Sequence, residues 1–406
     1  MELGGGLDKR LTSSSRIVPL EACRGIAAII VMLHHAILGF MPSITGILPN
    51  SAASFSMAGH WYYFIVNGGG AVDFFFTLSG FVLYWSVRTN KSDGYNVIAI
   101  LKRYPRLAFP VIISTVLSWL LFKLNAYYFV EASKISGSPW LATFASADWT
   151  PNFQVSLFRA IREGAETFFT GSRYYNSNLW TMKPEFIGSI FVFMLAPSVK
   201  KSNGALIIFF LFVIALAYSI ITYKYLLGFC VGMFLSEVIY RAMSGCFEVP
   251  SWISVILVLL GFYFLGYIGP YGDYGWLGGL TVLGTYGLDD LSVVHTLGSS
   301  LIIASIMMNE RAYNWLSGYI FNFIGRVSFP LYLVHILAIS SISSLVYICV
   351  FEFTADMPIA FLSATTTTIA SSFLMAFWLA QLDELWVKWL NNSIRRCNES
   401  ATAVKE

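Results

Sequence analysis

Long apolar runs separated by short polar segments fill most of the chain. A helix needs about 20 mostly apolar residues to cross the hydrocarbon core of a membrane. Ten runs approach that length: 17–41, 62–87, 107–130, 179–198, 204–222, 225–241, 251–268, 291–309, 327–350 and 359–382. The pattern therefore predicts an all-α, polytopic integral membrane protein with about ten transmembrane helices.

The composition agrees with this prediction. Hydrophobic residues make up 57% of the chain and charged residues only 12%, against roughly 25% charged residues in an ordinary soluble domain. A soluble globule of this composition would leave too much apolar surface in water, and a disordered chain is excluded for the same reason. The net charge of +3 gives no basis for a nucleic-acid partner, so membrane lipids are the expected surroundings.

An even number of helices places both termini on one side of the membrane. If that side is the cytoplasm, most lysines and arginines fall inside, as the positive-inside rule requires. The longest connection, about 131–178, would then cap the outer face. No repeat or linker divides the chain, so we expect one transmembrane domain over residues 1–390 and a cytoplasmic tail over 391–406.

The first apolar run concentrates ionisable residues, which are costly in a membrane and therefore indicate function. Arg24 and His35 are eleven residues apart, within about 20° of three full helical turns, so both lie on one stripe about 16 Å apart. Glu21 lies one turn before Arg24 and can pair with it. His34 points about 80° away from Arg24. The alternative is that Arg24 reaches the headgroups and His35 only hydrogen-bonds a neighbouring helix.

These residues resemble the opening signature of a known family. Glu21-Ala-Cys-Arg24-Gly25, followed ten residues later by His35, is similar to the first motif of the acyltransferase-3 family of integral membrane acyltransferases. Four further segments resemble the family's motifs in the same order: GAVDFFFTLSGF at 70–81, RYPR at 103–106, LWTMKPEF at 179–186 and GRVSFPLYLVH at 325–335.

The resemblance implies transfer of an acyl group, most simply acetyl, from cytoplasmic acyl-CoA (acetyl-CoA) to a hydroxyl group of a surface glycan, polysaccharide or glycolipid. It also implies a bacterial inner (plasma) membrane as the location. The chemistry needs a base for the hydroxyl proton and groups that stabilise the oxyanion. His35 is the candidate base or acyl carrier, and Arg24 and Glu185 are the other candidate catalytic residues.

The donor phosphates need cations at the cytoplasmic face. Arg103 and Arg106 lie on one side of a helical turn and suit this role, although both also fit a generic topology signal. Ser79, beside Gly80, is small enough to let a thin donor arm approach, and helix packing would explain it equally well. We therefore predict donor binding by Arg103, Arg106 and Ser79.

Four residues are candidates for the acceptor side. Asp73 is a charge in an apolar run, and Trp180 belongs to the fourth motif. Glu185, expected at the outer end of its helix, would accept hydrogen bonds from the acceptor or orient His35, unless it only pairs with Lys183. His335 is either a site residue or a packing histidine.

Another class of function fits part of the pattern. A proton-coupled transporter or flippase would use Arg24, His35 and Glu185 as a path through the bilayer. The five cysteines stand singly, with no cysteine and histidine cluster, so we expect no metal site.

Overall fold

The structure, a computed structural model, describes residues 17–47, 56–90, 94–145, 153–201, 225–286 and 289–403, and the side chains in these ranges except at 285–286 and after residue 396. All regular elements in these ranges are helical. The longer helices are α2 (Val18–Phe40), α3 (Gly68–Thr89), α4 (Tyr95–Lys123), α8 (Met182–Lys201), α10 (Leu226–Ser244), α12 (Asp290–Met308), α14 (Tyr319–Ala338) and α16 (Met357–Ala403).

The remaining elements are short. They are α5 (Phe129–Ser136), α6 (Pro139–Ala142), α7 (Leu157–Thr170), α11 (Ser251–Leu265), α13 (Glu310–Leu316) and α15 (Ser344–Thr354). Four 3₁₀ segments are η1 (Pro42–Ile44), η2 (Trp61–Ile65), η3 (Ser177–Thr181) and η4 (Gly272–Tyr286), and a π-helical turn, η5 (Ile339–Ser343), joins α14 to α15.

Eight helical stretches in the described ranges are long and apolar enough to cross a membrane: α2, α3, α4, η3 with α8, α10, α12, α14 through α15, and α16. The prediction of an all-α polytopic membrane protein is therefore confirmed. The predicted run 251–268 forms the shorter apolar helix α11, and the run 204–222 lies outside the described residues. The total of ten helices, the side of the termini and the division at residue 390 stay predictions.

Two helices begin at other places than the apolar runs indicate. The run 62–87 starts with η2, and α3 begins only at Gly68, where the Asn67 side chain caps the helix by accepting from the Gly70 N–H at 3.2 Å. Helix α4 begins at Tyr95, so Arg103 and Arg106 lie inside a helix and not in the connection before it.

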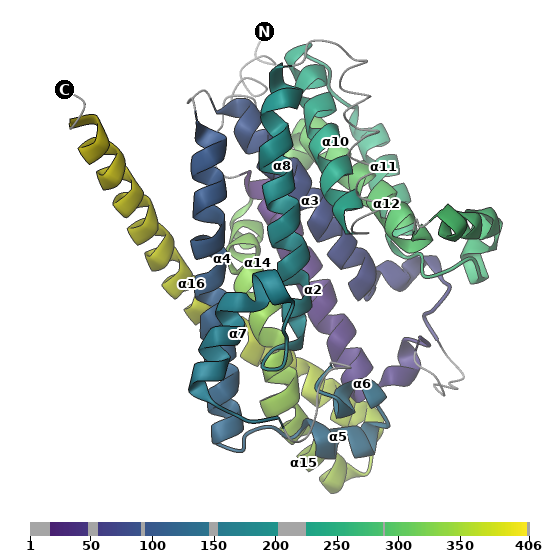
Figure 1. Ribbon diagram of the computed structural model, residues 1–406. Helices are drawn as coiled ribbons and strands as arrows, with labels where there is room; N and C mark the ends of the chain where they lie inside the picture. Colours follow the sequence, from purple (N-terminus) through teal and green to yellow (C-terminus); the bar gives the residue numbers. More distant parts are fainter. Residues whose placement is uncertain are drawn as a thin grey trace.

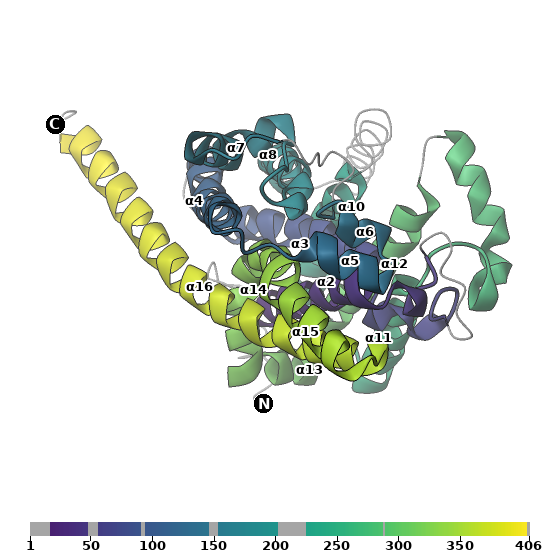
Figure 2. The same cartoon turned by 90° about the horizontal axis from the view of Figure 1, so that it is seen from below.

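Helix α2 runs through the middle of the bundle, between α3 and α14 (Figures 1 and 2). Glycines allow α2 and α14 to approach closely. A Cβ atom on Gly25 would lie 2.5 Å from the carbonyl oxygen of Ile324, and one on Gly325 would lie 2.8 Å from the backbone carbon of Glu21. This contact fixes the register of α14 along α2.

The two ends of the bundle differ. Helices α5, α6 and α15 gather at the lower end in Figure 1, towards which α2 runs. The C-terminal half of α16 extends away from the other helices (Figure 2). The connection 131–178 thus contains helices of its own, and α16 continues as a helix through the boundary expected at residue 390.

Candidate active site

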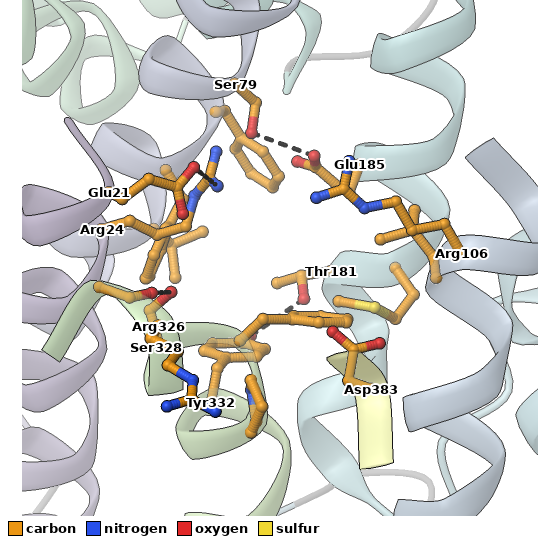
Figure 3. Close-up of a pocket in the computed structure, with 18 of the residues that line it drawn as sticks. Glu21, Arg24, Ser79, Arg106, Thr181, Glu185, Arg326, Ser328, Tyr332 and Asp383 are labelled. Atoms are coloured by element: carbon orange, nitrogen blue, oxygen red, sulfur yellow. Dashed lines mark hydrogen bonds and ion pairs between the residues drawn. The ribbon is translucent and has the colours of Figure 1, made fainter. Parts of the chain in front are cut away.

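A cavity of about 170 Å³ lies among α2, α3, α4, α8, α14 and α16. Charged side chains reach it from opposite sides, with Glu21 and Arg24 facing Glu185 and Arg106 (Figure 3). Five of the predicted site residues line it: Arg24, Ser79, Arg103, Arg106 and Glu185. The structure therefore brings together residues that lie on four helices and are separated by up to 161 positions, from Arg24 to Glu185.

Ion pairs neutralise part of this charge. Arg24 donates to Glu21 at 3.1 Å, as the helical spacing predicts. Arg103 pairs with Glu185 through one amine nitrogen and donates through Nε to the Ser189 hydroxyl at 2.8 Å. The Ser79 hydroxyl donates to the same Glu185 carboxylate at 3.0 Å. The Arg103 guanidinium is thus held by protein groups on two sides.

Glu185 lies in the first turn of α8, and this end of the helix is inside the bundle. It shares the cavity with Glu21 and Arg24, which lie near the start of α2. The reason is local: η3 precedes α8 and is held inside the bundle, because Asn176 donates to the Leu333 carbonyl of α14 at 2.7 Å. Helix α8 therefore begins well inside the protein.

Arg106 differs from Arg103. Its side chain is exposed, and the buried Oδ1 atom of Asp383, which lines the same cavity, has no hydrogen-bond partner in the described part of the chain. Arg326 reaches α16 and donates to Glu384 through Nη2 at 2.9 Å. Among these arginines, Arg106 is the one whose side chain is exposed, whereas the ion-paired Arg24, Arg103 and Arg326 are partly buried.

Two larger chambers adjoin the cavity. One, of about 480 Å³, shares Arg24, Arg106 and Asp383 with it and also includes Lys388. The other, of about 680 Å³ between α3, α4, α8 and α16, shares Arg106 and adds Lys102. Cationic side chains therefore line the space from the 680 Å³ chamber to the cavity, and this set is called the cationic route.

The two candidate histidines are in contact. Nδ1 of His35 lies 2.9 Å from Nε2 of His335, and their rings are stacked with centroids 5.1 Å apart. His335 is fully buried, whereas His35 keeps an accessible surface. Trp140 of α6 stacks on His35 at 4.9 Å. By contrast, the neighbouring His34 turns away and contacts the Val66 carbonyl at 2.7 Å.

Tyr332 joins the cavity to the histidine pair. It lines the cavity, and its ring centroid lies 5.9 Å from that of His335. The hydroxyl of Thr181, which lines the same cavity, lies 3.0 Å from the Tyr332 hydroxyl. These two residues form the boundary between the charged cavity and the histidines.

Asp73 and Trp180 lie apart from both groups. Asp73 is 2.8 Å from Nδ1 of the buried His295 on α12, whose Nε2 is 2.7 Å from the Tyr267 carbonyl. The Asn67 amide nitrogen also lies 3.4 Å from Nε2 of His295. Trp180 packs on Tyr225, with ring centroids 5.5 Å apart.

Sequence reasoning did not single out several residues that the structure places at these groups. His295 stands alone in an apolar run, and Asn178 precedes the fourth motif, so neither carries a pattern that marks it. Glu163 of α7 is buried and accepts from the backbone N–H groups of Tyr174 and Tyr175, which orders the connection leading to Asn178. Burial raises the pKa of Glu163, and these N–H donors oppose that shift.

Fold and site together define a helical membrane protein with charged groups and a histidine pair inside its bundle. Residues 17–377 match the family model of the acyltransferase-3 proteins, described as an acyltransferase domain. The chain therefore belongs to the acyltransferase-3 family, as its motifs indicate. No curated protein and no solved structure matches the chain.

Proposed function

We propose that the protein transfers an acetyl group from acetyl-CoA to a hydroxyl group of a surface glycan, polysaccharide or glycolipid at the bacterial inner membrane. Family membership supports acyl transfer in general. The observation that carries the proposal is the contact between the partly accessible His35 and the buried His335, at 2.9 Å. It provides an oriented imidazole within the membrane bundle, which is what removal of a hydroxyl proton needs.

The cationic route is the proposed donor site. Phosphate groups bind best to arginine, whose guanidinium donates two parallel hydrogen bonds, and lysine adds charge. The exposed Arg106 binds the phosphates, together with Lys102 in the 680 Å³ chamber. The ion-paired Arg103 mainly holds Glu185 and Ser79 in place. The aromatic wall of the cavity, including Phe75 and Phe76, then lies beside the narrow thioester arm.

Arg24 belongs to the donor side in this proposal. It lies eleven residues before His35 on the same helix, which corresponds to about 16 Å. At that distance it contacts the donor and not the reacting hydroxyl. Glu185 lines the same cavity, so it likewise acts on the donor side through its ion pair with Arg103.

The proposed reaction step centres on Nε2 of His35. This nitrogen takes the proton of the acceptor hydroxyl while the oxygen attacks the thioester carbonyl carbon. The new C–O bond forms, the C–S bond breaks, and the leaving sulfur takes the proton from His35. The products are an ester and a free thiol, and His35 returns to its starting state. Alternatively, Nε2 attacks the thioester itself and carries the acetyl group to the hydroxyl.

Release of free thiol tests the proposal. Purified protein in detergent, mixed with acetyl-CoA and glycans or glycolipids extracted from the host membrane, should release thiol in an acceptor-dependent way. A transporter or flippase would release none. Mass spectrometry of surface glycans from cells with and without the protein should then identify the acetylated hydroxyl, and identical glycans would contradict the proposed acceptor class.

A further inference from the structure

Asn178 contacts the histidine pair from a third element. It lies on the 3₁₀ turn η3, and its side chain is 2% exposed. Its Nδ2 donates to the Tyr332 carbonyl at 2.9 Å and lies 3.3 Å from Nε2 of His335. Because a carbonyl only accepts, the first bond fixes which end of the amide faces α14. The N–H₂ group, and not the amide oxygen, therefore points at the His335 ring.

The hydrogen bonds around His335 determine where its proton lies. Its Nδ1 is 3.0 Å from the Leu331 carbonyl of the preceding turn, so Nδ1 carries the proton. In the neutral ring Nε2 is then unprotonated and carries a lone pair that accepts hydrogen bonds. Two donors converge on this lone pair, Nδ1–H of His35 at 2.9 Å and the Asn178 amide at 3.3 Å. His35 therefore holds its own proton on Nδ1, which leaves its Nε2 free to accept.

We propose that Asn178 is a positioning residue for acyl transfer. Its amide keeps Nε2 of His335 unprotonated, and the unprotonated Nε2 in turn selects the tautomer of His35 with an accepting Nε2. The inference rests on the proposed role of His35 as base or acyl carrier. Asn178 acts through His335 and does not contact the substrate.

The Asn178 amide is held firmly enough for this task. Its backbone N–H donates to the Asn176 side chain at 3.2 Å, and its carbonyl accepts from the Thr181 hydroxyl at 3.1 Å. Asn176 is itself bound to the Leu333 carbonyl of α14. The turn is therefore anchored to α14, and this keeps the Asn178 amide directed at His335. The titratable neighbours that contact the pair are His34, with its ring 5.6 Å from that of His35, and Tyr332.

Two substitutions of similar size separate donation from packing. Asn178→Asp keeps the shape but replaces the donor with an acceptor, which draws a second proton onto His335. His35 then accepts at Nδ1 and carries its proton on Nε2, where it no longer acts as a base. We expect kcat at pH 7 to fall on the order of 10⁴-fold, as for other wrong-tautomer variants. The acidic limb of the pH–rate profile should move to higher pH, with little change in the donor KM.

Asn178→Ala removes the donor without adding an acceptor. We expect a fall in kcat of about tenfold, as for one lost hydrogen bond, with the pH–rate profile unmoved. Ser177→Ala is the matched control, because the buried Ser177 hydroxyl has no hydrogen-bond partner in the described ranges. It should leave the rate unchanged. Asn176→Ala should loosen the turn and lower thermal stability without moving the pH–rate profile.

Nitrogen NMR gives a readout independent of activity. The chain has five histidines, so the spectrum of protein labelled with ¹⁵N-histidine is readily resolved by single substitutions. Wild type should show neutral His335 with an unprotonated Nε2, and Asn178→Asp should convert it to imidazolium at pH 7. If the aspartate variant does not fold, Asn178→Ala still tests the idea, since an unchanged rate would overturn it.

Failure of this inference is distinguishable from failure of the proposed function. Suppose that His35→Ala is inactive, but Asn178→Asp shows an unshifted pH–rate profile and a neutral His335. This result would overturn the role of Asn178 alone. Full activity of His35→Ala would overturn the proposed chemistry, whatever the Asn178 variants do.

Discussion

Nδ1 of His35 and Nε2 of His335 lie 2.9 Å apart across α2 and α14, although 300 residues separate them in the sequence. The contact depends on the register of two closely packed helices. Gly25 and Gly325 set that register where the backbones of α2 and α14 approach most closely, about three turns from the histidines. The distance between the two histidines thus depends on the close contact of the α2 and α14 backbones at these glycines.

The first prediction concerns this approach. Gly25→Ala should destabilise the protein by about 1–3 kcal/mol, because the new methyl group overlaps the backbone of α14 at Ile324. The helices must separate, so activity should fall as well. Thermal unfolding and thiol release, measured on the same preparation, check both effects.

Gly39→Ala is the control for that variant. It lies on the same helix, but its Cβ would meet only side-chain atoms, the nearest at 3.6 Å. It should keep wild-type stability and activity. Equal loss in the two variants would show that glycine content, and not the contact with α14, matters for α2.

The two arginines of the RYPR motif should behave differently. Arg106→Ala should raise the donor KM about tenfold, since Arg106 is accessible and faces the cavity, and should leave thermal stability nearly unchanged. Arg106→Lys should lie between wild type and alanine, because lysine keeps the charge but loses the planar pair of donors. Donor titration in detergent measures this effect without any contribution from membrane insertion.

Arg103→Ala should act mainly on folding. The pair of Arg103 and Glu185 is largely buried, with side chains 12% and 16% exposed, and removal of one partner of a buried pair costs about 3–5 kcal/mol. Adding Glu185→Gln to Arg103→Ala should recover part of the loss. Additive losses in the double variant, or an Arg103→Ala variant that is stable but has weak donor affinity, would place Arg103 on the donor instead.

Asp73 and His295 should behave as one unit. Asp73→Asn and His295→Gln should each lower thermal stability, and the double variant should lose less than the sum of the two, because the contact between the two side chains is lost in either case. Ser292→Ala is the control, since its hydroxyl donates to Asp289 at 3.0 Å and lies 3.5 Å from Asp73, so its loss should add independently to that of Asp73→Asn. Strict additivity would show that the pair does not interact.

The orientation in the membrane is also testable. A reporter that is active only outside the cytoplasm should give signal when fused after residue 140, within α6, and none after residue 95 or residue 400. These positions follow from the excess of lysine and arginine at one side of the predicted helices. Signal from the fusion after residue 400 would contradict an even number of crossings.

Relationships within one helix could be predicted from the sequence. The spacing of Glu21 and Arg24 indicates their ion pair, and the apolar runs locate most of the membrane helices, because both depend on helical periodicity or length alone. The family motifs also identified both histidines. All of these features are local.

Relationships between helices could not be predicted in the same way. The length of the run 179–198 does not reveal that α8 starts inside the bundle, so it does not predict the contact between Glu185 and Arg103. Nothing in the sequence pairs Asp73 with His295, since the contact depends on how α3 and α12 pack. Packing register is a property of the whole bundle, and a periodic pattern carries no information about it.

The most direct test of the account is the rate of acceptor-dependent thiol release by His35→Ala beside His34→Ala. The two residues are adjacent in one helix, but only His35 contacts His335 (2.9 Å), whereas His34 contacts the Val66 carbonyl (2.7 Å). We predict that His35→Ala inserts normally and loses transfer, because alanine neither takes a proton nor carries an acyl group, and that His34→Ala retains most of the rate. Near-normal turnover of His35→Ala with an inactive His34→Ala would contradict the account.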